Sequence, residues 1–119
     1  MISEKIMTKT VIDLLDEKVI EFNSRIDDEP KFSSMIKDKS RSICISVTDE
    51  DNYSTRLDNM RIEDFAKTED LEADLVVTAN AETFIGLIGK EISPIKAYMS
   101  GDLKVKASLT DMLLLKRLF

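Results

Sequence analysis

Histidine and tryptophan are absent from this chain of 119 residues, and glycine, proline and cysteine are scarce. Without histidine the protein lacks the commonest general base, the commonest metal ligand and the usual partner of a serine or cysteine nucleophile. Its glycines are Gly86, Gly89 and Gly101, and they do not form a phosphate-binding fingerprint. The sequence therefore gives little support to hydrolytic or nucleotide-dependent enzymes, and it indicates no catalytic residue, cofactor or metal ion.

The single cysteine, Cys44, excludes an internal disulfide and gives no sign of an oxidising compartment. The N-terminus also lacks the apolar core of a secretory signal, so we expect a cytoplasmic protein. Cys44 falls within an expected strand, near Ser42 and Ser46, and not in the electropositive or helix-terminal setting that activates a thiol. We interpret it as a structural residue and not as a nucleophile.

The length fits one domain, 1–119, since such a chain buries roughly two-thirds of its unfolded surface and leaves nothing for a second core. Its 43% apolar and 34% charged residues suit a folded globular protein, and no apolar run could span a bilayer. The formal net charge of −6 argues against a nucleic acid partner, which needs clustered Lys and Arg. Anionic bilayers repel the same charge, so membrane contact must be local, apolar and transient.

Apolar residues recur at steps of three and four over residues 7–26, which predicts an amphipathic helix from Met7 to Ile26. Pro30 cannot continue that helix. The type of segment 31–41 stays open between a short helix and a turn. Segment 42–48 alternates apolar with polar residues and predicts a strand with one buried face, with Cys44 on the other face.

The acidic cluster 49–52 is typical of a hairpin turn and has too few spaced oxygen ligands for a calcium loop. Residues 75–77 are apolar on both faces and predict a central strand covered on each side. Asn80 is expected to cap a helix that Gly89 ends. The other expected elements are a strand with Tyr53, Thr55 and Leu57, a turn at Asp58-Asn59, a weaker strand from Met60 to Phe65, a short helix from Ser93-Pro94 to Gly101, a half-exposed strand over 103–107, and a final helix from Leu109 to Leu118 that Ser108 and Asp111 start as a capping box.

The segment from Ser93 to Lys106, SPIKAYMSGDLKVK, resembles the most recognisable part of the sterol carrier protein type 2 domain family. In that family the stretch runs as Pro, two residues, Ala, an aromatic residue, Met, one residue, Gly and an alternating strand of apolar residues and Lys. The strand 73–78, the helix with Phe84 and the Gly89-Lys90 step are similar too, so the likeness covers residues 73–119. Ala107 is a departure, because the family usually has Gly there.

This resemblance implies a mixed α/β fold in which helices cover a mostly antiparallel five-stranded sheet, with an apolar tunnel between the layers. It also implies a protein that is not an enzyme and that binds or transfers a fatty acid, an acyl-CoA, an isoprenoid or a sterol-like lipid in that tunnel. The residues that we expect to bind the ligand are Phe84, Ile88, Tyr98, Met99, Leu103, Val105, Met112, Leu115 and Phe119.

The final helix carries apolar residues around most of its circumference, more than one core face uses. The surplus could line the tunnel, bind a second copy of the chain, or touch a bilayer beside Lys116 and Arg117. The alternative function is therefore a dimerisation or accessory interaction module with a collapsed tunnel. A third hypothesis, an enzyme acting on a thioester, requires carboxylates such as Asp74, or Tyr98, to replace the missing histidine.

Overall fold

The computed structural model describes residues 10–118, and its first helix, α2 (Val11–Asp28), confirms the amphipathic pattern. The Thr10 hydroxyl accepts the N–H of Asp13, whose carboxylate accepts the N–H of Thr10, so a capping box starts the helix. Positions 7–9 of the expected helix lie outside the described residues. The helix continues past Ile26 to Asp28.

Segment 31–41, whose type the sequence left open, begins with a short helix, α3 (Pro30–Ile36), in which Pro30 takes the first position. The Phe32 ring meets the Phe22 ring of α2 edge to face, with ring centroids 4.9 Å apart. The Arg25 guanidinium lies 4.8 Å from the centroid of the Phe32 ring. These contacts fold α3 back onto α2.

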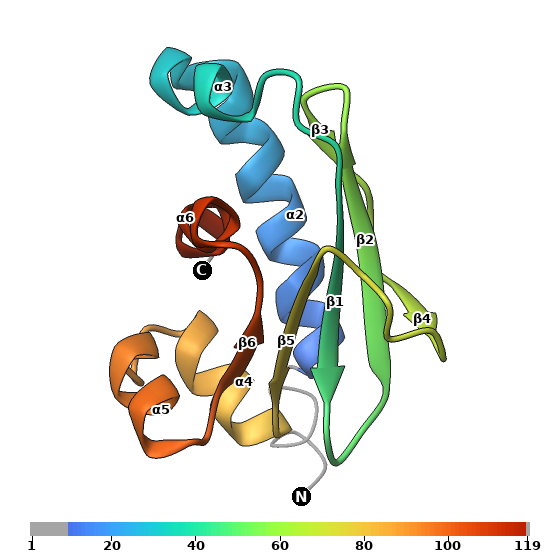
Figure 1. Cartoon of the computed structure of the whole chain (residues 1–119), viewed down its shortest axis with the longest axis vertical. Coiled ribbons are helices and arrows are strands. Elements are labelled where there is room, and N and C mark those ends of the chain that lie inside the picture. Colours follow the sequence, from blue (N-terminus) through green and yellow to red (C-terminus); the bar gives the residue numbers. More distant parts are fainter. Residues whose placement is uncertain (1–9, 119) are drawn as a thin grey trace, which may run out of the picture.

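The strands form one mixed sheet in the order β3-β2-β1-β5-β6, with β4 paired to β2 (Figure 1). β1 and β5 run parallel, and the other pairings among the described strands are antiparallel. The mostly antiparallel sheet is therefore confirmed, with β4 as an addition to the expected five strands. The bounds are β1 (Arg41–Val47), β2 (Asn52–Asp58), β3 (Arg61–Ile62), β4 (Ala66–Thr68), β5 (Leu75–Ala79) and β6 (Lys104–Lys106).

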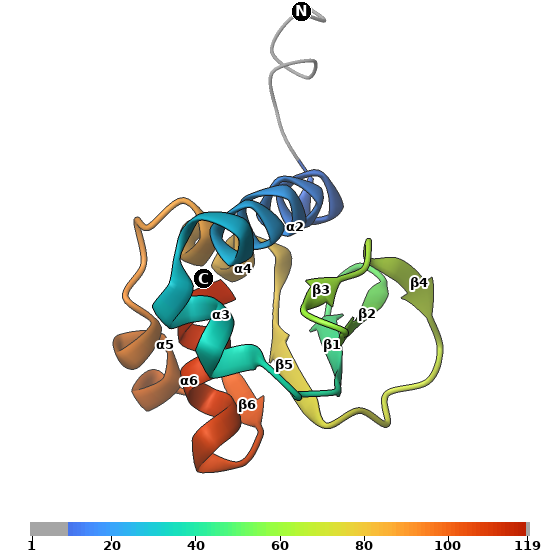
Figure 2. The ribbon, with the colours of Figure 1, turned by 90° about the horizontal axis from the view of Figure 1, so that it is seen from above.

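The helices gather on one side of the sheet, as two perpendicular views show (Figures 1 and 2). α2 packs against α3, α4 and α6. The predicted caps form: the Asn80 side chain accepts the N–H of Thr83, and the Ser93 hydroxyl accepts the N–H of Lys96. Gly101 ends its helix in the left-handed conformation, with φ of 88°. The helices concerned are α4 (Ala81–Ile88), α5 (Pro94–Ser100) and α6 (Leu109–Leu118).

The expectation that β1 has one buried face is wrong. The alternation places Cys44 opposite Ile43 and Ile45, yet Cys44 is fully buried and Ser46 is buried too. β1 pairs with a strand on each edge, and the segment between β4 and β5 brings Asp70 close to Cys44. Burial, together with the charge of Asp70, raises the pKa of the Cys44 thiol. The middle of the sheet is therefore covered on both faces.

β5 lies between β1 and β6, which confirms its central position. Its inward residues Leu75, Val77 and Ala79 are buried, but Val76 on the other face is only half-buried. The expected full cover on both sides of this strand is therefore wrong. On the outer face of the sheet, the side chains of β1 are therefore more buried than those of β5 and β6.

The strand expected from Met60 to Phe65 is shorter than predicted, since β3 ends at Ile62. The turn before it forms, with left-handed φ values of 50° at Asn59 and 60° at Met60. The Asn23 side chain of α2 accepts the N–H of Ile62 and donates to its carbonyl, at 2.9 and 3.0 Å. The Asn23 side chain thus satisfies the N–H and the carbonyl of Ile62, which would pair with another strand if β3 were longer. The chain leaves the sheet at this point.

Candidate functional site

An apolar layer lies between the sheet and the helices, and it contains part of the expected ligand-binding set. Phe84 and Ile88 come from α4, Leu103 precedes β6 and Leu115 comes from α6, and all four are buried in one continuous core. α2 contributes its whole apolar face to the same core, namely Val11, Leu15, Val19, Phe22 and Ile26. Residues far apart in the sequence therefore meet in one hydrocarbon interior.

The other expected ligand-binding residues lie elsewhere. Val105 of β6 is half-buried against the core. Tyr98, Met99 and Met112 are exposed, with 52%, 80% and 39% of their surfaces accessible. Phe119 lies outside the described residues. The structure thus brings four of the nine residues together inside the protein and places three on its surface.

The exposed residues belong to two apolar helix faces. On α5 the exposed Ile95, Tyr98 and Met99 follow helical spacing, and on α6 the exposed Leu109, Met112 and Leu113 follow the same spacing. Both helices lie on the helical side of the sheet, with α6 above α5 in the view of Figure 1 (Figures 1 and 2). We call these six residues the C-terminal apolar surface. Most of the large exposed apolar side chains of the described residues belong to it.

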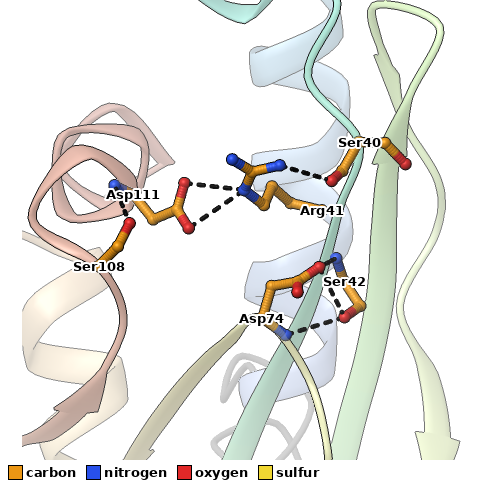
Figure 3. Close-up of polar contacts among 6 residues, drawn as sticks. All are labelled: Ser40, Arg41, Ser42, Asp74, Ser108 and Asp111. Carbon is orange, nitrogen blue, oxygen red and sulfur yellow. Dashed lines mark hydrogen bonds and ion pairs between the residues drawn. The ribbon is translucent and has the colours of Figure 1, made fainter.

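Two arginines fasten α6 to the rest of the fold. The Arg41 Nε at the start of β1 lies 3.0 and 3.1 Å from the two carboxylate oxygens of Asp111, as Figure 3 shows. The Arg25 Nη1 of α2 donates to the Arg117 carbonyl at 2.9 Å. The Ser108 hydroxyl accepts the N–H of Asp111, as the expected cap requires. Both ends of the helix are thus tied to other elements.

Asp74, a candidate for acid–base chemistry, is bound to the protein itself. Its carboxylate accepts the backbone N–H and the hydroxyl of Ser42 (Figure 3). The backbone N–H of Ser42 lowers the pKa of Asp74 most, and the nearby charges of Arg41 and Arg56 act in the same direction. A general base works best with a pKa near the ambient pH, so this carboxylate is suited to a structural contact.

A polar groove of about 330 Å³ opens on the outer face of the sheet. Most of its lining residues carry charged or hydroxyl side chains, and the other two are alanines. Pockets for apolar ligands are lined mainly by hydrophobic and aromatic side chains, and this groove has none larger than alanine. The lining residues are Ser42, Ser54, Thr55, Arg56, Glu63, Asp64, Ala66, Thr68, Asp70, Glu72 and Ala73.

The ion pair of Arg41 and Asp111 is a feature that the sequence pattern did not predict. The capping-box prediction gives Asp111 a local role, yet this residue lies three and four positions before Leu114 and Leu115 on one helix face. Those two leucines are buried, and so is Asp111. An acidic residue within an apolar helical stripe was the available signal, because a buried carboxylate requires a partner. Nothing in the sequence identified that partner as Arg41.

Two other kinds of site find no support within residues 10–118. No group of three or more side chains of the kinds that ligate metals comes together there. No helix in the same range is long and apolar enough to cross a membrane. The apolar layer and the C-terminal apolar surface are therefore the features to be compared with known proteins.

A sheet covered on one side by helices, with an apolar interior between the layers, defines a small mixed α/β domain. The chain belongs to the SCP-2 sterol transfer family, whose model matches residues 19–119. That match extends well upstream of the likeness seen in the sequence. No curated protein matches the chain.

Solved structures with this fold are distant in sequence. The solution structure of sterol carrier protein 2 from Aedes aegypti in complex with palmitate is 13% identical, with a TM-score of 0.65, and the match covers 91% of this chain and 93% of that one. The apo form of sterol carrier protein 2 from Yarrowia lipolytica is 19% identical, with a TM-score of 0.55, covering 91% and 86%. At these identities the likeness concerns the fold.

A larger protein contains a similar unit. The match to the sec-alkylsulfatase Pisa1 from Pseudomonas sp. has a TM-score of 0.55 and 14% identity, and it covers 66% of this chain. The chain spans only 12% of the sulfatase. The fold therefore also occurs as one part of an enzyme several times longer.

Proposed function

We propose that this protein is a non-catalytic carrier that binds an apolar ligand reversibly between its sheet and its helices. The observation that carries the proposal is the continuous apolar interior of a chain that belongs to the SCP-2 sterol transfer family. The Aedes aegypti relative binds palmitate, which supports long-chain lipids as the ligand class. Fatty acids come first among the candidates, followed by acyl-CoA, isoprenoid and sterol-like lipids. A cytoplasmic location suits the single free thiol.

The interior residues would form the wall of the ligand tunnel, and the exposed ones its mouth. Phe84, Ile88, Leu103 and Leu115 are buried, so a ligand must displace or part them. An empty cavity of roughly 300 Å³ would cost about 7 kcal/mol, close to the whole stability of a domain. A carrier of this size is therefore expected to close its tunnel when the ligand leaves. Met99 and Met112, being flexible, suit a mouth that opens and closes.

Native mass spectrometry of the freshly purified protein, followed by organic extraction, tests the proposal. We expect a bound acyl chain or isoprenoid at about one per chain, or saturable binding of added palmitate. A clean protein mass together with no binding of palmitate or acyl-CoA would refute a lipid carrier. Met112→Glu should weaken binding more than folding, because it places a charge at the mouth. Ile20→Glu on α2, where the side chain is 71% exposed, is the matched control and should leave binding unchanged.

We also propose that the carrier touches membranes through the C-terminal apolar surface. Residues 94–118 contain five Lys and Arg against two Asp, a formal charge of +3 in a chain of −6. Exposed apolar groups flanked by cations suit an anionic bilayer. We expect co-sedimentation with vesicles containing phosphatidylglycerol and less with pure phosphatidylcholine vesicles. Leu109→Glu should abolish it and Ile20→Glu should not.

The second candidate function is a dimerisation or accessory interaction module, and the exposed apolar face of α6 favours it. In that case Leu109 and Leu113 would pack against the same face of another copy, with the tunnel collapsed. Sedimentation equilibrium over a wide concentration range separates the two functions. A concentration-dependent mass with no lipid binding would support the module, and a monomer that binds lipid would support the carrier.

A further inference from the structure

Arg41 occupies an unusual place for a charged residue. It opens β1 two positions before the buried Ile43, and its register partner on β2 is the buried Leu57. The strand alternation therefore places its side chain on the inner face of the sheet. From there it reaches α6, as Figure 3 shows. A guanidinium thus lies at the rim of the apolar layer in which we propose that the ligand binds.

The partner of Arg41 is a carboxylate in apolar surroundings. The Asp111 side chain is only 7% exposed, and the Arg41 side chain is 33% exposed. Asp111 shares its helix face with the buried Leu114 and Leu115. The guanidinium therefore already holds a carboxylate that is flanked by hydrocarbon groups, and the head group of a fatty acid would present the same chemistry.

The guanidinium of Arg41 keeps one nitrogen for a further acceptor. Arg41 donates to Asp111 through Nε and to the Ser40 carbonyl through Nη1, and within the described residues Nη2 has no partner. Removing two charges from water cancels much of the attraction between them, so a buried ion pair adds little net stability. An arriving carboxylate can take the place of Asp111 on the guanidinium, provided that the Asp111 side chain, which is 7% exposed, turns to water so that it does not stay buried and unpaired. Asp111 then stays near the N-terminus of α6, where the helix dipole favours an acidic group.

We propose that Arg41 is the anchor for the carboxylate head group of the carried lipid, and that Asp111 occupies this anchor when no ligand is present. This inference rests on the proposed carrier function and adds its head-group specificity. The chain of the ligand lies in the apolar layer, and its carboxylate displaces Asp111 at the rim. α6 loses one fastening when the ligand enters and regains it when the ligand leaves.

Binding of palmitate and of methyl palmitate, measured by titration calorimetry, tests the anchor. Palmitate offers a carboxylate, whereas the ester offers the same chain without a charge. We expect Arg41→Gln to weaken palmitate binding by roughly tenfold to a hundredfold, the range for a lost charge-assisted hydrogen bond. Binding of the ester should change less than about twofold. Asp111→Asn should strengthen palmitate binding and leave the ester unchanged, because the competing carboxylate is gone.

Arg61→Gln is the matched control, since it removes an exposed guanidinium paired with Asp27 and changes the net charge equally. It should alter neither affinity. If Arg41→Gln does not fold, Arg41→Lys keeps the charge but loses the planar fork, and it should weaken palmitate binding alone. Equal losses for both ligands, or no loss for either, would overturn the anchor and leave the carrier intact. A wild-type protein that binds neither ligand would overturn the carrier function itself.

Discussion

Ser42 and Asp74 hold each other through three hydrogen bonds at the point where the parallel strands β1 and β5 begin. The Asp74 carboxylate accepts the Ser42 N–H at 2.9 Å and the Ser42 hydroxyl at 3.2 Å, and the Ser42 Oγ accepts the Asp74 N–H at 2.9 Å. The first paired residues of the two strands, Ile43 and Leu75, follow directly. The contact therefore sets the register of the parallel pair.

We expect the stabilising effect of this contact to depend on pH. The pKa of Asp74 is lowered in the folded protein, so its contribution is complete above the unfolded value of about 3.9 and is lost as the pH falls through the folded pKa. Asp74→Asn should therefore destabilise the protein at pH 7 and make progressively less difference below about pH 4. Urea denaturation of both proteins at a series of pH values measures this. A difference that stays constant down to pH 2 would contradict it.

Phe84 and Tyr98 represent the buried and the exposed members of the expected ligand-binding residues. Phe84 is fully buried on α4, so Phe84→Ala should lower the free energy of unfolding by about 3 to 5 kcal/mol. Tyr98→Ala removes an exposed ring and should change it by less than about 0.5 kcal/mol. Denaturant titration of the ligand-free protein compares them. Similar losses in the two variants would show that Tyr98 packs in solution.

Cys44 should not react in the native protein. Its side chain is fully buried, and its thiol pKa is raised by burial and by Asp70, so little thiolate forms near neutral pH. We expect Ellman's reagent to label it at the rate at which the protein opens, and rapidly in 6 M guanidinium chloride. Fast labelling without denaturant would mean that the outer cover of β1 opens readily.

Gly101 should tolerate asparagine better than alanine. Its φ of 88° is left-handed, and an added Cβ would meet no atom within 4 Å, so the cost of Gly101→Ala lies in the backbone. That cost is about 1 kcal/mol. Gly101→Asn should cost less, since asparagine adopts this conformation more readily. Thermal unfolding ranks the three proteins, and equal midpoints would exclude the backbone argument.

Local chemistry predicted the elements whose boundaries depend on adjacent residues. The caps at Asn80, Ser93 and Gly101 lie where the sequence placed them, because each needs only neighbouring backbone groups. The length of β3 could not be predicted in the same way. It depends on Asn23, which comes from a helix 39 residues earlier in the chain.

In the candidate site, too, the sequence predicted what depends on neighbouring residues and not what depends on distant ones. Phe84 and Leu115 were both expected to bind the ligand, and both are buried in the apolar layer. The pattern could not distinguish a wall residue from a surface residue on α5, where Tyr98 and Met99 are apolar and exposed. Charge pairing across the fold, as in Arg41 with Asp111, depends on a chain separation of 70 residues and has no local signature.

The position of β1 in the sheet has a consequence for the order of folding. On one edge it forms a hairpin with β2, in which Ser46 and Asn52 pair across a short turn. On the other edge it pairs with β5, and the paired residues lie 32 positions apart in the chain. Hairpins close within about 1 to 10 μs, whereas distant pairings wait for longer loops to close. The edge of β1 that pairs with β5 is therefore expected to form its hydrogen bonds later than the edge that pairs with β2. Until β5 arrives, that apolar edge is open to strands of other molecules, which makes it the place where aggregation would compete with folding.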